Sequence, residues 1–290
     1  MVPLIELAQG LPWLYLSLIF LFSLMIGSFL NVVIHRLPIM LEREWQAEYR
    51  SYFAPDEEAT APERYNLMVP RSACPHCGHA ITALENIPLL SWLWLKGRCR
   101  DCQAPISARY PLVELLTALL SVAVAMVITP GWGTLAALLL TWVLVALTFI
   151  DLDKMLLPDQ LTLPLLWLGL LLNTQGTFVD LSDAVIGAAA GYLVLWTLYW
   201  TFKLLTGKEG MGYGDFKLLA ALGAWLGWQA LPLILILASA VGALVGISLL
   251  LLRRHQQGHP IPFGPYLATA GWIALLWGAS INHWYLSTLL

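Results

Sequence analysis

Charged residues are scarce in this 290-residue chain, at 11%, whereas hydrophobic residues make up 59%. A soluble domain has about 25% charged residues, so the composition excludes an ordinary water-soluble globule and also a disordered chain. The net charge is only −3, which leaves no basic field for nucleic acid, and we expect no nucleic-acid partner. Cysteine is also scarce, with four residues in the whole chain.

The few charges are unevenly distributed. Residues 35–110 contain nine Lys/Arg and nine Asp/Glu, whereas the other 214 residues share the remaining 15 charges. An α-helix needs about 20 apolar residues to cross the hydrocarbon core, and continuous rather than alternating apolar runs favour helices over a barrel. The sequence therefore predicts an all-α polytopic membrane protein with about eight transmembrane helices, at 13–34, 111–128, 134–150, 161–173, 184–202, 218–229, 231–252 and 266–288.

The distribution of Lys and Arg predicts the orientation. No Lys or Arg precedes Arg36, so the positive-inside rule places the N-terminus outside the cytoplasm and the 35–110 loop inside it. With eight crossings, all 15 Lys/Arg fall on the cytoplasmic side; without a crossing at 218–229, Arg253 and Arg254 would lie outside. Twelve residues of helix span only about 18 Å, so that segment would need extra residues or shelter by protein.

All four cysteines lie within the polar segment, as Cys74-Pro-His-Cys77 and Cys99-Arg-Asp-Cys102. Each C-x2-C pair can place two sulfurs on one ion, and two pairs complete the tetrahedron that zinc prefers. The alternative is two disulfides, but thiols stay reduced in the cytoplasm. His76 and His79 are either further ligands or surface histidines beside the site. We expect a structural zinc site formed by Cys74, Cys77, Cys99 and Cys102.

The predicted organisation has three parts. Residues 1–34 form the first transmembrane helix, residues 35–110 a cytoplasmic zinc-binding loop domain, and residues 111–290 the membrane core. A polar insert of this size has little hydrophobic core of its own, and a bound metal can replace one.

Two acidic residues lie at the cytoplasmic edge of the predicted membrane region. Asp151 ends the apolar run 134–150, and Asp215 precedes the run 218–229. A charged side chain at membrane depth is costly and usually functional. The helix macrodipole disfavours a negative charge at the C-terminal position of Asp151 and favours one at the N-terminal position of Asp215. If the two carboxyls meet, we expect them to share one proton and to act as general base and general acid in aspartyl proteolysis.

Each acidic residue also has a structural interpretation. A lone aspartate at the interface more often caps a helix or pairs with a lysine, and Lys154 and Lys217 are available partners. Asp153 and Asp159 are weaker catalytic candidates, and Asp159 is a candidate N-cap. Glu114 falls in the first turn of its predicted helix, where capping explains it.

Two predicted bends lie on the same face as the aspartates. Four glycines crowd into residues 207–214, but no strand precedes them and no G-K-[ST] follows, which argues against a nucleotide-binding loop. Glycine at positions 212 and 214 instead lets the backbone bend sharply and a peptide approach closely. The second bend, Pro260–Pro265, has a plainer interpretation as a turn before the last helix.

Taken together, these motifs resemble the GxGD intramembrane aspartyl proteases, and most closely the bacterial type 4 prepilin leader peptidases. The matching elements are Gly212-Tyr-Gly-Asp-Phe-Lys217, Ile150-Asp-Leu-Asp153, the double C-x2-C and Pro262-Phe-Gly-Pro265. Three further stretches agree with the family pattern, namely Gly27–Pro38, Asn86–Pro88 and Arg109–Glu114. The resemblance covers nearly the whole chain.

The resemblance implies Asp151 and Asp215 as catalytic residues, with a supporting active-site loop set of Gly212, Gly214, Lys217, Pro262, Phe263 and Gly264. It implies cleavage of short basic leaders of type IV prepilins and type II secretion pseudopilins, after glycine, at the cytoplasmic face of the bacterial inner membrane. It also implies N-methylation of the new N-terminal residue with S-adenosylmethionine. The sequence does not identify the residues that contact this methyl donor, although the loop Glu85–Gly97 is a candidate region.

Two other classes of protein share some of these features. Transporters have intramembrane acids and broken helices, but their acids usually lie near the midplane between repeats, whereas these two lie at one edge. A zinc-anchored scaffold of a secretion apparatus would tolerate loss of both aspartates. The combined motifs favour the peptidase.

Overall fold

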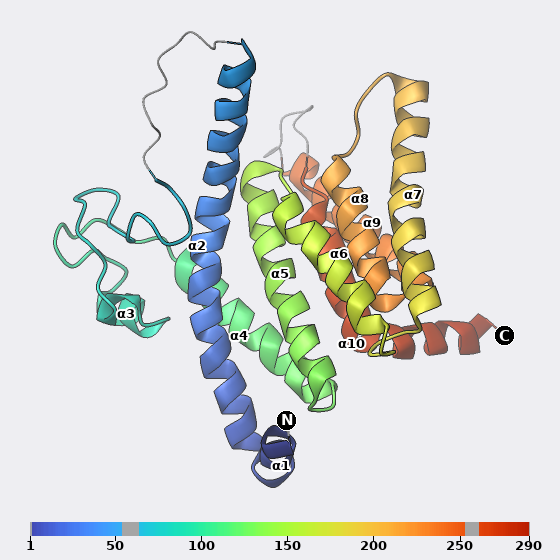
Figure 1. Ribbon diagram of the computed structural model, residues 1–290, viewed down its shortest axis with the longest axis horizontal. Coiled ribbons are helices and arrows are strands. Elements are labelled where there is room, and N and C mark those ends of the chain that lie inside the picture. The colour runs from blue at the N-terminus through green and yellow to red at the C-terminus, as the bar shows by residue number, and fades with distance from the viewer. Residues whose placement is uncertain (1, 54–63, 253–260, 290) are drawn as a thin grey trace. The chain divides into compact units, whose positions relative to one another are not determined.

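The computed structural model describes residues 2–53, 64–252 and 261–289, and its regular elements there are helices apart from two isolated β-bridges (Figure 1). The predicted all-helical fold is confirmed for these residues. The chain packs as two compact units, Met1–Met126 and Val127–Leu290. The first unit contains the four cysteines, and the second contains Asp151 and Asp215.

Five helical segments in the described part of the chain are long and apolar enough to cross a membrane. They are α2 (Pro12–Phe53), α4 (Arg109–Val127), α5 (Trp132–Lys154), α7 (Leu181–Thr206) and Trp228–Leu249, which includes most of α9 (Leu231–Leu251). The protein is thus a multi-pass membrane protein. Helices also occupy the other three predicted positions, as α6 (Asp159–Asn173), α8 (Tyr213–Leu226) and α10 (Gly264–Leu289). Arg253 and Arg254, which enter the predicted orientation, lie outside the described residues.

The first long helix does not end where the apolar run ends. Residue 34 was the predicted boundary, but α2 continues to Phe53 with Pro38 inside it. Residues 39–53 contain no glycine or proline, and nine of the 15 are good helix formers: three Glu, two Arg, and one each of Leu, Met, Gln and Ala. Nothing in the sequence therefore stops the helix when it leaves the apolar stretch, and the predicted boundary between the first span and the loop domain falls within one helix.

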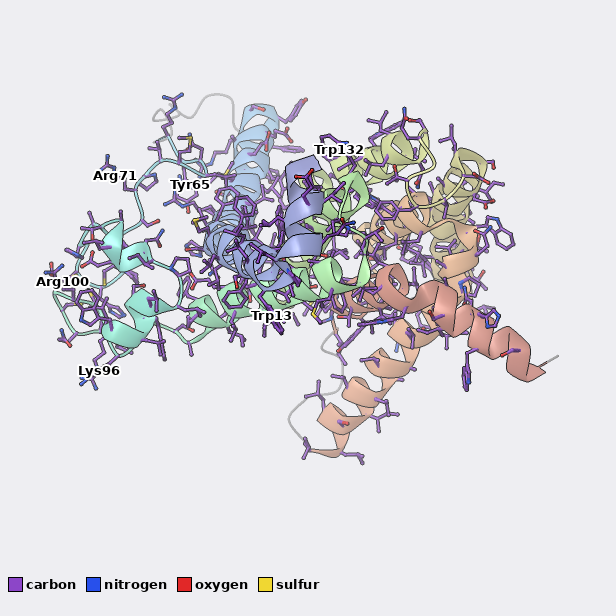
Figure 2. The ribbon with its side chains drawn as sticks, turned by 90° about the horizontal axis from the view of Figure 1, so that it is seen from below. Trp13, Tyr65, Arg71, Lys96, Arg100 and Trp132 are labelled. Atoms are coloured by element: carbon purple, nitrogen blue, oxygen red, sulfur yellow. The ribbon has the colours of Figure 1, made fainter. Side chains whose placement is uncertain are left out.

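The first unit consists of α1 (Val2–Gly10), α2, α4 and the loop region between the two long helices, which contains the short helices η1 (Leu84–Asn86) and α3 (Leu90–Trp94). Gly27 lets α2 approach α4 closely, because a Cβ there would lie 2.7 Å from the Cα of Glu114. The loop region returns to α2 at Tyr65, whose ring lies 4.1 Å below the Arg43 guanidinium. Lys96 and Arg100 point outward at the far edge of this region (Figure 2).

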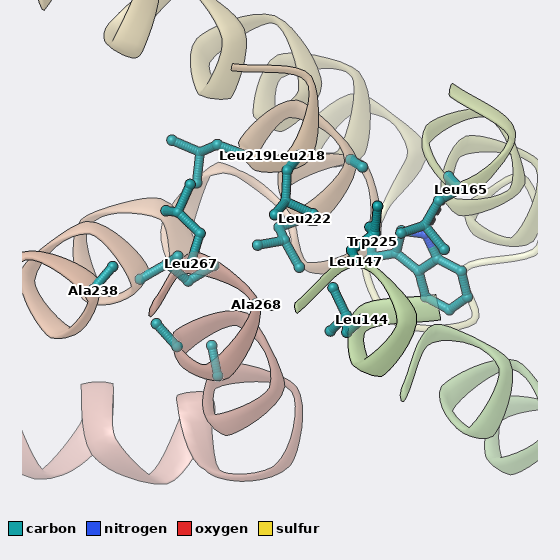
Figure 3. Packing of buried hydrophobic residues seen from close by; sticks show 14 of the residues in the cluster. Leu144, Leu147, Leu165, Leu218, Leu219, Leu222, Trp225, Ala238, Leu267 and Ala268 are labelled. Carbon is teal, nitrogen blue, oxygen red and sulfur yellow. Dashed lines mark hydrogen bonds between the residues drawn. The ribbon is translucent and has the colours of Figure 1, made fainter. Parts of the chain in front are cut away.

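The second unit is built around α8, whose residues from Asp215 to Trp225 are all buried except Lys217, which is half-buried. Helix α8 packs against α6, α7 and α10 and is sheltered by protein rather than by lipid. Leu219 and Leu222 lie in the apolar core with leucines of α5 and α6 and with Leu267 of α10 (Figure 3). The Trp225 indole also lies in this core, and its N–H donates to the Leu165 carbonyl at 2.8 Å.

Small residues bring α7 and α8 into direct backbone contact. Gly187 and Gly191 form a G-x-x-x-G pair on α7, and Gly187 faces Gly223 of α8 so closely that a Cβ on either would collide with the other helix. A Cβ at Gly191 would lie 2.6 Å from the Leu219 carbonyl oxygen. Close packing of this kind holds helices together where lipid removes the hydrophobic driving force.

Candidate functional site

Asp151 lies in the last turn of α5 and is only 5% exposed. Helix α5 ends just after it, at Met155, which adopts a left-handed conformation and donates its N–H to the Asp151 carbonyl at 2.9 Å. The side-chain Oδ2 of Asp151 accepts a hydrogen bond from the Gly264 N–H at 3.0 Å. A segment 113 residues further along the chain therefore fixes the carboxyl of Asp151.

Asp215 lies in the first turn of α8, behind the N-cap residue Gly212, and is 7% exposed. The turn is closed by the Asp215 N–H, which donates to the Gly212 carbonyl at 3.3 Å. Its Oδ1 is buried and has no hydrogen-bond partner among the described residues. Asp215 also interacts electrostatically with Asp151, so the structure brings the two carboxyls into the same site. The predicted helix-end positions of both residues are confirmed.

Leu157 packs against both bent segments, at Gly214 and at Gly264, a contact that the sequence alone did not reveal. It is 7% exposed, and it touches both glycine positions that flank the aspartates. A Cβ at Gly214 would lie 2.8 Å from the Leu157 Cβ, and one at Gly264 would lie 3.1 Å from its methyl carbons. No motif marked this residue, since a leucine in an apolar chain carries no signal of its own.

Three other residues of the predicted supporting set, Lys217, Pro262 and Phe263, make no contact with the aspartates that the structure records. Lys217 does not pair with either buried aspartate, because its Nζ binds both carboxylate oxygens of Asp159 at 2.7 Å. Asp159 was a candidate N-cap, but that position belongs to Pro158, and Asp159 is the first helical residue of α6. Phe263 begins the turn into α10, since its carbonyl accepts the N–H of Leu267 at 3.2 Å. Pro262 beside it is half-buried.

An aromatic cluster lies beside the GxGD turn and was also missed. The Tyr213 ring, within the motif, lies 5.2 Å from Phe216 and 5.4 Å from Tyr199 of α7, measured between ring centroids. Tyr199 and Phe216 are buried. These rings pack the start of α8 against α7 and so fix the turn that carries Asp215.

We expect Gly264→Ala to lower leader cleavage about 100-fold, the size of loss that a displacement of about 1 Å causes in a catalytic group. The new Cβ would lie 2.6 Å from Oδ2 of Asp151 and would push the carboxyl out of place. Initial rates on a leader peptide in detergent measure the effect. The matched control is Gly246→Ala, whose Cβ meets nothing closer than 3.5 Å and should leave the rate unchanged. Equal rates for both variants would contradict this role of Gly264.

The four cysteines converge in the first unit. All four sulfurs lie within 4.8 Å of one another, with Cys74 and Cys102 at 3.8 Å and Cys77 and Cys99 at 3.9 Å. These separations are too long for disulfides and close to the value of about 3.8 Å that tetrahedral geometry with Zn–S bonds of about 2.3 Å requires. The cluster is therefore suited to holding a metal ion.

The two C-x2-C turns have the same backbone pattern. Cys74 N–H binds the His79 carbonyl, and Cys99 N–H binds the Ala104 carbonyl, both at 2.9 Å. Each turn is closed by one isolated β-bridge, Ala73 to Ala80 and Arg98 to Pro105. The two matching turns therefore each bring a pair of sulfurs to the same cluster.

The two nearby histidines are not part of the sulfur cluster. The His79 ring instead joins the two turns, with Nδ1 at 2.8 Å from Asp101 and Nε2 at 3.2 Å from Glu85. Hydrogen bonds from the Thr82 N–H and hydroxyl, followed by His79, lower the pKa of Glu85 to about 2. Because this pKa is depressed, the stabilisation is present above the unfolded value of about 4.3 and is lost as the pH falls towards 2.

Glu114 was expected to cap α4, but the structure shows that it does not. It is the sixth residue of the helix, is 8% exposed, and accepts the Leu89 N–H at 2.8 Å. The helix begins at Arg109, earlier than the apolar run indicated. Glu114 therefore lies beyond the first turn, and its side chain is buried instead of facing the free amides at the start of the helix.

Comparison with known proteins shows the family of the chain. Residues 21–128 match the bacterial peptidase A24 N-terminal domain, and residues 138–247 match the type IV leader peptidase family. The chain is 83% identical over 287 residues to the prepilin leader peptidase/N-methyltransferase of Aeromonas hydrophila, which covers 99% of each chain. It is 57% identical over 284 residues to the protein of that name from Pseudomonas aeruginosa, which covers 98% of each chain. No solved structure matches it. The chain belongs to the type IV leader peptidase family.

Proposed function

We propose that this protein cleaves the basic leader of type IV prepilins and type II secretion pseudopilins after glycine, with Asp151 and Asp215 as the catalytic pair. The observation that carries the proposal is that two buried carboxyls from distant helix ends share one site, next to two glycine-containing bends. Family membership favours this peptidase over the transporter and scaffold alternatives.

In the proposed mechanism one carboxylate accepts a proton from a water molecule, and the water oxygen attacks the scissile carbonyl carbon. The other carboxyl, protonated, donates to the carbonyl oxygen, and the C–N bond then breaks with a proton passing to the leaving amine. The Gly264 N–H holds one oxygen of Asp151 in a fixed position. Oδ1 of Asp215, without a partner in the described protein, is available for the water or the substrate.

The protein then methylates the amine that cleavage exposes, with S-adenosylmethionine as methyl donor. When bound, S-adenosylmethionine supplies an electrophilic methyl group. We propose that zinc occupies the four-cysteine cluster and has a structural role, since four thiolates leave no open coordination position. We place the protein in the bacterial inner membrane with eight crossings, its N-terminus outside the cytoplasm and its cysteine-containing loop inside.

Incubation of the purified protein in detergent with a synthetic prepilin peptide tests both activities by mass spectrometry. We expect loss of the leader, and a gain of one methyl group on the product only when S-adenosylmethionine is added. The control peptide carries a bulky residue in place of the glycine before the cleavage site and should stay intact. A prepilin peptide that remains uncut by folded protein in lipid nanodiscs as well as detergent would refute the peptidase.

A further inference from the structure

The cysteine-containing loop carries an exposed apolar surface that neither the metal cluster nor the catalytic pair uses. From Ile81 to Leu93 every third residue is a leucine or isoleucine, and all of these side chains are exposed. Four large side chains are between 63% and 81% exposed and form what we call the apolar face, namely Leu84, Leu90, Leu93 and Trp94. A contiguous apolar patch on a surface marks a site of contact with protein or membrane.

Helix α3 is held so that the apolar face points away from the loop. The Trp92 indole N–H donates to the Ile106 carbonyl at 3.2 Å, and its ring packs on Gly97, where a Cβ would lie 2.9 Å from the indole. Its neighbours Leu93 and Trp94 take no part in this packing, since they are 63% and 81% exposed. Because Trp92 already fills the inner side of α3, the loop does not cover the apolar face itself.

Contacts within the first unit place the start of α3 at the depth of the apolar run of α2. The Leu89 N–H, directly before α3, donates to the Glu114 carboxylate at 2.8 Å. Glu114 lies against Gly27 of α2, where a Cβ would be 2.7 Å from the Glu114 Cα. Gly27 precedes the end of the apolar run 13–34 by seven residues, or about 10 Å along the helix. That distance exceeds the length of a glutamate side chain, so Leu89 lies at membrane depth.

The charges beside the apolar face match those of a segment at a membrane surface. Lys96 and Arg98 follow α3 directly and are exposed. Glu85 is the only acidic residue between positions 81 and 98, and its carboxylate is held by Thr82 and His79. Cations next to a tryptophan at the edge of an apolar segment are typical of the membrane interface, where the cytoplasmic leaflet carries negative charge.

We infer that the apolar face inserts into the cytoplasmic leaflet of the bilayer, so that the cysteine-containing loop docks on the membrane. At the depth of Leu89 the surrounding medium is hydrocarbon, and acyl chains rather than a water-soluble partner cover exposed apolar side chains. The loop is joined at both ends to the membrane-crossing helices α2 and α4, so little chain entropy is lost on insertion. Figure 1 shows α3 level with the start of α4 and not with the cytoplasmic end of α2. This docking rests on the proposed orientation but on neither proposed activity.

Photolabelling of the full-length wild-type protein in lipid nanodiscs tests the docking. A hydrophobic diazirine dissolves in the bilayer and, on illumination, labels side chains that contact acyl chains; mass spectrometry then maps the label. We expect the apolar face to be labelled as strongly as Leu21, an exposed apolar side chain of α2. The matched control is Met68, which is 84% exposed in the same loop. Met68 is tied through Asn66 to Arg36, beyond the apolar run, and should stay unlabelled.

A double variant, Leu93→Glu with Trp94→Glu, should lower the labelling of Leu90 by about tenfold or more, because the bilayer excludes the two new charges. Met68→Glu should leave it unchanged. The wild-type result stands whether or not the double variant folds. An apolar face that stays unlabelled while Leu21 is labelled would overturn the docking. Loss of the label when a prepilin peptide is added, or label that appears only after dilution separates copies of the chain, would place a peptide or a second copy on the face and overturn it too.

Discussion

Asp151→Asn and Asp215→Asn should each lower the rate of leader cleavage by a factor on the order of 10³, the contribution of a positioned acid or base. Asparagine has the same shape and keeps an oxygen that can accept the Gly264 N–H, so both variants should fold. It can neither take a proton from water nor donate one in the way a carboxyl does. Initial rates on a prepilin peptide, with melting temperatures measured in the same detergent, give the comparison.

The matched controls are the two other acidic residues near the site. Asp153→Asn and Asp159→Asn remove the same charge from exposed positions. Asp159 loses its ion pair with Lys217, but an exposed pair contributes only about 0–1 kcal/mol, so cleavage should change little. If Asp151→Asn or Asp215→Asn cut at a rate comparable to wild type, that aspartate would be structural, and Asp153 or Asp159 would become the next catalytic candidate.

Much of the second unit follows from local sequence. Continuous apolar runs predict helices because a buried or lipid-facing helix needs no polar face, and the two aspartates stand out because charge is rare there. The short segment at 218–229 was the hardest case. The structure begins α8 at Tyr213 and buries it among α6, α7 and α10, which supplies both the extra residues and the shelter that its length requires.

The features that sequence reasoning missed depend on contacts between distant residues. Gly187 and Gly223 matter because they face each other across two helices, and each alone is an ordinary glycine in an apolar segment. Leu157 acts through its neighbours, Gly214 and Gly264, which lie 57 and 107 positions away in the chain. Glu114 was assigned to a cap because helix ends are the least certain part of a sequence-based prediction, and a shift of a few residues changes which way a side chain faces.

Removal of zinc should open the cysteine-containing loop. Within residues 64–108, Cys99 is the only side chain of the buried apolar core, so the loop has very little hydrophobic core of its own. A structural zinc site contributes roughly 10–16 kcal/mol of binding free energy in small zinc domains. We expect a chelator, or Cys99→Ser, to remove the bound zinc and to make residues 64–108 sensitive to protease. Elemental analysis and limited proteolysis measure the two effects.

The control for this experiment is His76→Ala, because His76 lies between two of the cysteines in sequence but outside the sulfur cluster. It should retain zinc and protease resistance. A Cys99→Ser protein that lacks zinc but keeps full protease resistance would show that the loop does not depend on a metal. Wild-type protein purified without zinc, and unable to take it up, would show that the sulfur separations of 3.8 and 3.9 Å are a packing arrangement rather than a coordination site.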